Sequence, residues 1–142
     1  MTEKLLLLHL SDIHIKTSSD AILSRAGSIA AATFPRLPEI HTLALVVSGD
    51  IAFSGTAQQY GLGTGSIAQI KATIAKEAPR VQIEVFVCPG NHDCDFGLHD
   101  DTRAAVLAKI RTLEGADPSD SLVNTASSVQ DAFFAFRNIV SD

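Results

Sequence analysis

Apolar residues gather in three short runs that predict buried strands. The runs cover residues 5–10, 42–48 and 81–88, and turn-forming residues follow each of them. Their apolar positions are continuous and do not strictly alternate with polar ones, which is typical of strands in a sheet covered on both faces. We therefore expect these three segments to form a buried central sheet.

Segments with helical character separate the three runs. Residues 20–33 are rich in alanine and begin with Asp20, which predicts an N-cap at that position. Residues 56–77 begin at Thr56, place isoleucines at helical spacing and end before Pro79. The order strand–helix–strand–helix–strand predicts parallel strands joined by crossover helices, and therefore an α/β layered fold.

The pattern changes after residue 98, where two helical segments follow and no further strand is predicted. The segments are 100–115, with Gly115 past the helix end, and 128–140. One stripe of the second segment is apolar: Phe133, Phe136 and Val140. We therefore interpret the chain as one partial domain with a motif-bearing βαβαβ part, residues 1–99, and a helical segment, residues 100–142.

The stretch "YGLGTGS", residues 60–66, conflicts with the second predicted helix. It places three glycines in the helix interior, and each lowers helix stability by about 1 kcal/mol relative to alanine. The stretch lacks the Gly-Lys-Ser/Thr ending of a phosphate-binding P-loop and does not directly follow a strand. We predict a loop or flexible break here, followed by a shorter helix.

Composition narrows the class of protein. The chain has 142 residues, of which 46% are hydrophobic and 19% charged, which indicates a globular domain and excludes a disordered chain. A net charge of −5 without a basic run argues against broad, non-specific nucleic-acid binding. The N-terminal apolar stretch is too short for a signal peptide or a membrane span. Cys88 and Cys94 match no disulfide framework or zinc-finger spacing, which predicts reduced thiols in a cytoplasmic protein.

Polar side chains follow each predicted strand at the point where the strand ends. Asp12 and His14 follow the first, Asp50 the second, and Asn91 and His92 the third. Because the carboxyl ends of parallel strands meet at one edge of a sheet, these side chains are expected to converge. Carboxylate, amide and imidazole donors suit Mn, Fe or Zn. The sequence therefore predicts a metal site at this edge.

The spacing of these residues suits two ions. In extended backbone, Asp12 and His14 would point to the same face and chelate one ion. Asp50 follows a glycine that permits a sharp turn, and its two oxygens would bridge two ions. Asn91 would offer a neutral oxygen to the second ion, and His92 would face the substrate.

Each residue also has a purely local explanation. Asp12 and Asp50 would stabilise turns, and Asn91 would adopt a left-handed conformation after Pro-Gly. His9, inside the first apolar run, is predicted to be a hydrogen-bonded core histidine and not a ligand. The joint position of the set at three strand ends favours the metal site over separate turns.

The stretches "SDIH", "VVSGDIAFSG" and "CPGNHDCD" resemble the first three motifs of the calcineurin-like metallophosphoesterases. That family's pattern is D-x-H, then G-D, then G-N-H-D/E, and the likeness spans residues 8–96. The resemblance implies the family fold, a layered β-sandwich flanked by helices, of which only the N-terminal βαβαβ portion is predicted here. It also implies a metal-dependent phosphoester hydrolase with a dinuclear site, in which hydroxide attacks phosphorus.

The resemblance implies a role for each motif residue. The metal ligands would be Asp12 and His14 for the first ion, Asp50 for both, and Asn91 for the second. His92 would be the catalytic histidine, and Asp93 would orient it through a hydrogen bond. The cofactors would be two divalent ions: Mn, Fe or Zn.

The family's two later histidine motifs have no counterpart, since no histidine follows His99. We therefore expect this chain to be the N-terminal part of a larger phosphoesterase, or to be completed by an oligomer or a partner chain. The substrate would be a phosphodiester, such as a nucleotide or nucleic acid, more than a phosphomonoester, with weak or no turnover by the isolated chain. The alternative is a non-catalytic, truncated module that acts in assembly or regulation with a partner.

Overall fold

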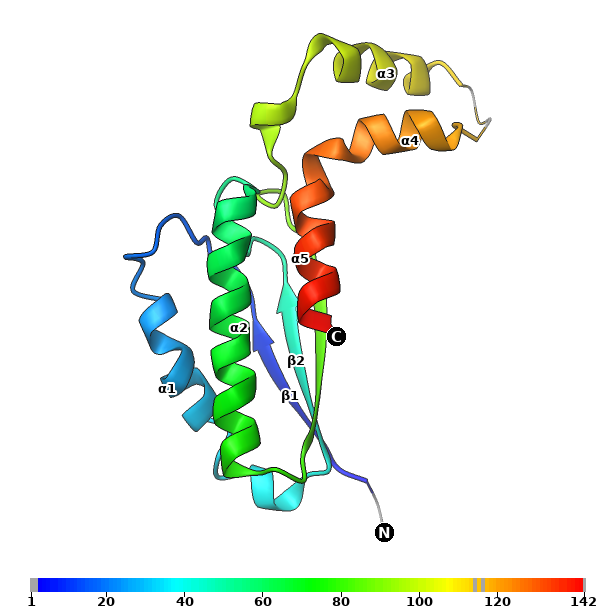
Figure 1. Cartoon of the computed structure of the whole chain (residues 1–142). Coiled ribbons are helices and arrows are strands. Elements are labelled where there is room, and N and C mark those ends of the chain that lie inside the picture. Colours follow the sequence, from blue (N-terminus) through cyan, green and yellow to red (C-terminus); the bar gives the residue numbers. More distant parts are fainter. Residues whose placement is uncertain (1–2, 114, 116, 142) are drawn as a thin grey trace.

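Three parallel strands form the centre of the structure, with β2 between the other two (Figure 1). The computed structural model describes residues 3–113, 115 and 117–141. The strands are β1 (Leu5–Leu10), β2 (Thr42–Ser48) and β3 (Gln82–Cys88), within one residue of the predicted bounds. Their parallel pairing confirms the predicted α/β architecture and brings the three carboxyl ends to one edge.

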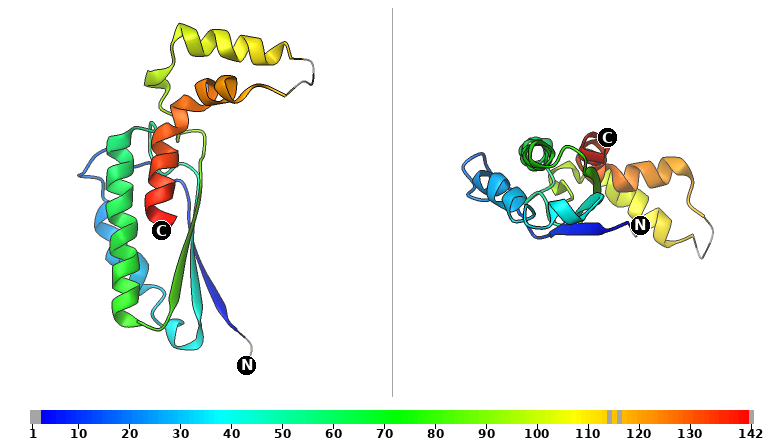
Figure 2. Two further views of the ribbon diagram at one scale, coloured as in Figure 1. Left: turned by 45° about the vertical axis from the view of Figure 1, so that its right-hand side comes forward. Right: turned by 90° about the horizontal axis from the view of Figure 1, so that it is seen from below.

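Helices cover one face of this sheet (Figure 2). They are α1 (Ala26–Ala31), α2 (Ala57–Glu77) and α5 (Asp131–Ser141). The side chains of β2 that face them are fully buried: Leu43, Leu45 and Val47. Burial of these apolar side chains against the helices is the main force that holds the layers together.

The opposite face of the sheet is open in the described part of the chain. Leu5, Leu7 and Phe86 lie on it with 63%, 58% and 56% of their surface exposed. The expectation of a sheet covered on both faces is therefore wrong for these residues, because all three packed helices lie on the same side. His9 also lies on the open face, hydrogen-bonded to Ser48, so it is a paired but exposed histidine and not a core one.

The helix α2 runs unbroken through residues 60–66, so the predicted loop or break is wrong. Thr56 caps the helix by accepting a hydrogen bond from the amide of Gln59. Gly63 faces Phe136 of α5, and a Cβ there would lie 3.6 Å from that side chain, an ordinary packing distance. One stripe of the helix is buried: Ile67, Ile70 and Ile74. The burial of this stripe outweighs the low helix propensity of the glycines.

The first predicted helix is shorter than its sequence pattern. Residues 20–33 contain one 3₁₀ turn followed by α1 (Ala26–Ala31). Asp20 is not an N-cap. Its carboxylate instead accepts hydrogen bonds from the amides of Lys16 and Thr17, which lie before it in the chain. These bonds lower the pKa of the Asp20 carboxyl below its ordinary value, because they favour the charged form.

A helical hairpin extends beyond the strand ends (Figure 1). Its helices are α3 (Asp101–Arg111) and α4 (Asp120–Ser127). Asp100 is the N-cap of α3, and α4 was missed by the sequence pattern. The chain then returns through α5, whose predicted stripe is buried in the same core as the sheet: Phe133, Phe136 and Val140. The division at residue 99 stays a prediction. Within the described ranges, no helix combines the length and apolar character needed to cross a bilayer.

Replacing Gly61 or Gly65 with alanine tests the continuous helix. A Cβ at either position meets no atom within 4 Å, so each change is expected to raise the free energy of unfolding by about 1 kcal/mol. Urea unfolding followed by circular dichroism measures this. The matched control is Gly115→Ala at φ +90°, which is expected to lose stability because alanine disfavours that conformation. Unchanged stability in both helix variants would contradict the helical assignment.

Candidate metal centre

The loops that follow the three strands are hydrogen-bonded to one another beyond the sheet. The amide of Asp12 donates to the carbonyl of Gly49 at 3.3 Å, and the amide of His14 donates to the carbonyl of Asp50 at 2.8 Å. Gly49 in turn donates to the carbonyl of Cys88 at 2.9 Å. The loops therefore form one backbone layer, and their side chains are positioned relative to one another.

Backbone strain is concentrated in these loops. Among the described residues, the non-glycine positions with positive φ are Asp12 (54°), His14 (51°) and Asp50 (52°). The extended backbone expected for Asp12 and His14 is therefore wrong. A left-handed conformation at a non-glycine residue costs on the order of 1–3 kcal/mol and persists where surrounding contacts impose it. Such strain is typical of functional sites.

Three of the predicted side chains come together. Donor atoms of His14, Asp50 and His92 all lie within 4.8 Å of one another. His14 Nε2 is 4.0 Å from Asp50 Oδ2, and the His14 and His92 rings meet edge to face with centroids 4.7 Å apart. His14 Nδ1 is buried and has no hydrogen-bond partner in the described part of the chain. Two imidazoles and one carboxylate form a donor set that suits a divalent Zn, Fe or Mn ion, so these residues fit a metal.

Asp50 is oriented by the loop that follows β3. Its Oδ1 accepts a hydrogen bond of 2.9 Å from the amide of His92, which leaves Oδ2 on the side of His14. The carboxylate passes directly over Gly90, where a Cβ would lie 2.2 Å from Oδ1. Only glycine fits there, so the glycine of the "PGNHD" stretch is a structural requirement of the Asp50 position.

The ring of His92 is held by a carbonyl and not by Asp93. His92 Nδ1 lies 2.8 Å from the carbonyl oxygen of Phe53. This contact requires the proton on Nδ1 and leaves the lone pair of Nε2 for a ligand. The hydrogen bond expected from Asp93 to His92 is wrong, because the Asp93 carboxylate is fully used elsewhere.

Asp93 is fully buried and binds four donors. Its carboxylate accepts hydrogen bonds from the amides of Ile51, Ala52 and Gly90, and from the hydroxyl of Tyr60 at 2.8 Å. These bonds compensate for the loss of water around the charge. They join the loop after β2, the loop after β3 and helix α2. Asp93 therefore shapes the backbone around Asp50 instead of acting on His92.

Tyr60 was missed at the sequence level because it lies in the glycine-rich stretch that predicted a break. Burial of the phenol, together with its hydrogen bond to the Asp93 carboxylate, raises the pKa of Tyr60 above its ordinary value. The hydrogen bond ties α2 to the loop that carries His92. The helix therefore contributes to the site through a residue that does not itself belong to the cluster.

Asp12 does not belong to the cluster of His14, Asp50 and His92. Asp12 is exposed and borders an apolar cavity of about 170 Å³ between the loop after β1 and helices α1 and α2. Asn91 is exposed and lines a cleft beside His92. Their roles as metal ligands stay predictions.

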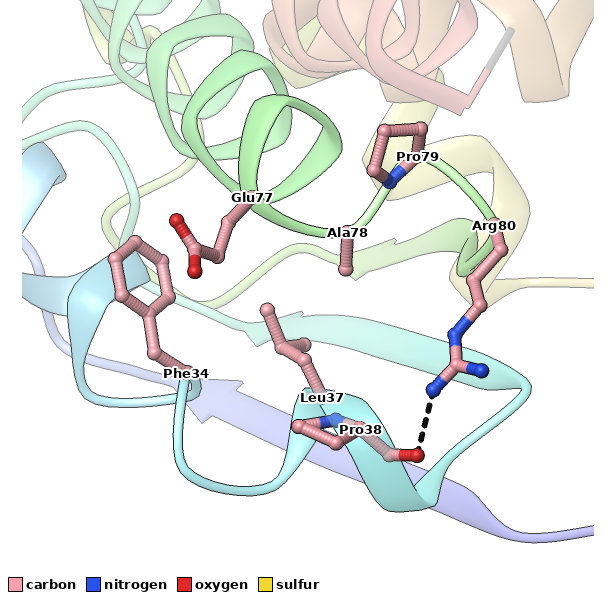
Figure 3. A pocket seen from close by; sticks show the side chains of 7 residues that line it. All are labelled: Phe34, Leu37, Pro38, Glu77, Ala78, Pro79 and Arg80. Atoms are coloured by element: carbon pink, nitrogen blue, oxygen red, sulfur yellow. Dashed lines mark hydrogen bonds between the residues drawn. The ribbon is translucent and has the colours of Figure 1, made fainter.

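A second cleft, of about 340 Å³, lies at the opposite edge of the sheet (Figure 3). It is formed by segments 34–38 and 77–80, which precede β2 and β3. Arg80 is bonded there to the carbonyl of Pro38 at 2.6 Å. This second cleft lies at the other end of the strands from His14, Asp50 and His92 and contributes no residue to their cluster.

Residues 5–133 match the family model of the calcineurin-like phosphoesterases. Because the match covers most of the chain, this protein belongs to that family of metal-dependent phosphoester hydrolases. The resemblance of the three motifs is thereby confirmed, and the α/β structure is consistent with a part of the family fold. A search of curated proteins and a search of solved structures each found no significant match.

The ionisation of Tyr60 provides a direct test of the Asp93 network. Tyr60 is the one tyrosine and the chain has no tryptophan, so tyrosinate absorbance reports on it alone. With the folded pKa raised above the unfolded value of about 10, the stabilisation is complete below that pH and is lost as the pH rises through the folded pKa. We expect tyrosinate absorbance to appear together with loss of the helical circular-dichroism signal. Tyrosinate formed while the helical signal is intact would contradict the network.

Proposed function

We propose that this chain carries one wall of the active site of a metal-dependent phosphodiesterase. The observation that supports it most is the cluster of His14, Asp50 and His92 at the strand ends of a calcineurin-like chain. Asp12 and Asn91 would complete the coordination of two divalent ions of Mn, Fe or Zn.

The residues would divide the work of hydrolysis. Divalent ions bound here would supply positive charge to the phosphoryl oxygens and a hydroxide nucleophile near neutral pH. His92, with its Nδ1 directed at the Phe53 carbonyl, would take up a proton on Nε2 and present it to the leaving oxygen. His14 and Asp50, and not His92, would then be the metal ligands of the cluster. Asp93 would act as a positioning residue, because its carboxylate binds the backbone on both sides of the cluster.

A diester is the proposed substrate, in preference to a monoester. The cleft beside His92 has a volume of about 320 Å³ and is also lined by Phe53, Asn91 and Phe96, which leaves room for a second ester group. A nucleotide or a nucleic-acid end would fit this description. The free thiols of Cys88 and Cys94 support a cytoplasmic location.

An oligomer or a partner chain would cover the open face of the sheet. Leu5, Leu7 and Phe86 form an exposed apolar surface there, and surfaces of this kind mark protein contacts. We propose that turnover by the chain alone is weak, and that contact across this face brings the enzyme to full activity. A non-catalytic role in assembly or regulation is the alternative, and the same open face supports it.

Substitution of Asp50 tests the metal site. Asp50→Asn keeps an oxygen for the His92 amide but removes the charge. Manganese affinity, measured by calorimetry, is expected to fall at least about tenfold, or about 1.4 kcal/mol. Hydrolysis of bis(4-nitrophenyl) phosphate with manganese should fall to background. The control is Asp101→Asn, an exposed carboxylate at the start of α3, which should change neither. Unchanged manganese binding in Asp50→Asn would refute the site, and binding without hydrolysis by the unaltered chain would favour the non-catalytic alternative.

Light scattering after gel filtration tests the open face. The unaltered chain is expected to oligomerise as its concentration rises. Phe86→Glu should shift it to the monomer with an unchanged circular-dichroism spectrum, because the charge disfavours an apolar contact. Ile139→Glu is the matched control, since Ile139 is 61% exposed on α5, away from that face. A monodisperse monomer at every concentration would count against self-association.

A further inference from the structure

The cleft beside the metal cluster is bordered by two aromatic side chains. It lies between the loop after β2 and the 3₁₀ turn Phe96–Leu98 at the base of the helical hairpin. Its wall includes the following residues: Phe53, Ser54, Asn91, His92, Asp95 and Phe96. The volume of about 320 Å³ is at the lower end of the range for small-molecule sites. A ligand the size of a nucleoside would fill it.

Both aromatic rings remain in contact with water. Phe53 is 40% exposed and Phe96 is 61% exposed, although large apolar side chains are stabilised by burial. The Phe53 ring also lies near the His92 ring, with centroids 5.5 Å apart and planes inclined by 35°. An aromatic surface therefore runs from the catalytic histidine into the cleft. A planar ligand would recover the burial that these rings lack.

The backbone on both walls of the cleft is held in position without a ligand. The amide of Phe53 donates to the carbonyl of Ile15 at 3.0 Å, and its own carbonyl binds His92 Nδ1. On the other wall, Asp95 caps the turn by accepting from the amide of Gly97. Asp95 also donates its amide to the carbonyl of Val129 at 2.7 Å, which fixes the turn to the segment between α4 and α5. The cleft is thus preformed, and preformed sites lose less entropy on binding.

A cation accompanies the aromatic surface. Lys16 Nζ lies 4.0 Å from the centroid of Phe53 and belongs to the loop that carries His14. This cation–π contact holds the ring and places a positive charge beside Phe53, where it would attract an anionic phosphoester. The exposed side-chain amide of Asn91 adds a hydrogen-bonding group to the wall of the cleft.

We propose that this cleft binds the base of a nucleotide substrate, stacked on Phe53 and Phe96, and so directs its phosphoester towards His14, Asp50 and His92. The proposal rests on the proposed phosphodiesterase function and narrows its substrate class. Phosphoesters that lack a planar group would gain nothing from these rings and would be poor substrates.

Ligand binding without metal tests the base site separately from the metal site. Adenosine, adenosine monophosphate and ribose 5-phosphate are titrated into the isotope-labelled chain with a chelator present, and amide NMR shifts are followed. Adenosine and its monophosphate should shift the amides of segments 53–54 and 91–97, and ribose 5-phosphate should not. Phe53→Ala and Phe96→Ala should each weaken adenosine binding about fivefold to tenfold.

Controls separate stacking from general destabilisation. Phe53→Tyr keeps the ring and should keep the affinity. Phe134→Ala removes another exposed aromatic side chain that also carries a cation, Arg137, over its ring at 5.2 Å, and it should leave binding unchanged. An amide spectrum that retains the native dispersion establishes that each variant is folded.

Three results would overturn the proposal: adenosine causing no shift at the cleft, unchanged affinity in both alanine variants, or equal binding of ribose 5-phosphate. Manganese binding is measured separately, on the same variants without the chelator. Its failure would refute the metal site, while adenosine binding, which needs no metal, would still decide the base site.

Discussion

The buried carboxylate of Asp93 is the interaction on which the site depends. A fully buried charge is stable only when hydrogen bonds replace its water, and this one accepts bonds from two loops and from Tyr60 of α2. Removing any donor would leave part of the charge uncompensated. Asp93 therefore sets the relative position of elements that lie far apart in the sequence. The two loops that it joins carry Asp50 and His92 of the cluster.

The strain in the loops is supported by this network. Asp12, His14 and Asp50 adopt left-handed conformations that would relax if the loops were free. The backbone bonds between the loops, together with the Asp93 carboxylate, hold them there. Because Gly90 lacks a side chain, the Asp50 carboxylate can pass over it towards His14. The geometry of the candidate metal cluster is thus a property of three loops acting as one unit.

The layers also decide where the protein meets other molecules. Helices α1, α2 and α5 all pack on one face, so the core is built on that side and the other face remains apolar and open. The hairpin of α3 and α4 extends past the strand ends, and the turn Phe96–Leu98 that precedes it supplies one wall of the cleft beside His92. Substrate and partner are therefore expected on different surfaces.

The sequence by itself determined the three strands, their parallel order and the family, because apolar runs and motif spacing are local signals. It also identified His14, Asp50 and His92, since each directly follows a strand. Only the tertiary structure decided the rest. Helix α2 continues through its glycines because packing outweighs propensity. Three partners of Asp93, namely Ile51, Ala52 and Tyr60, lie more than thirty positions from it in the chain, and no local pattern records such contacts.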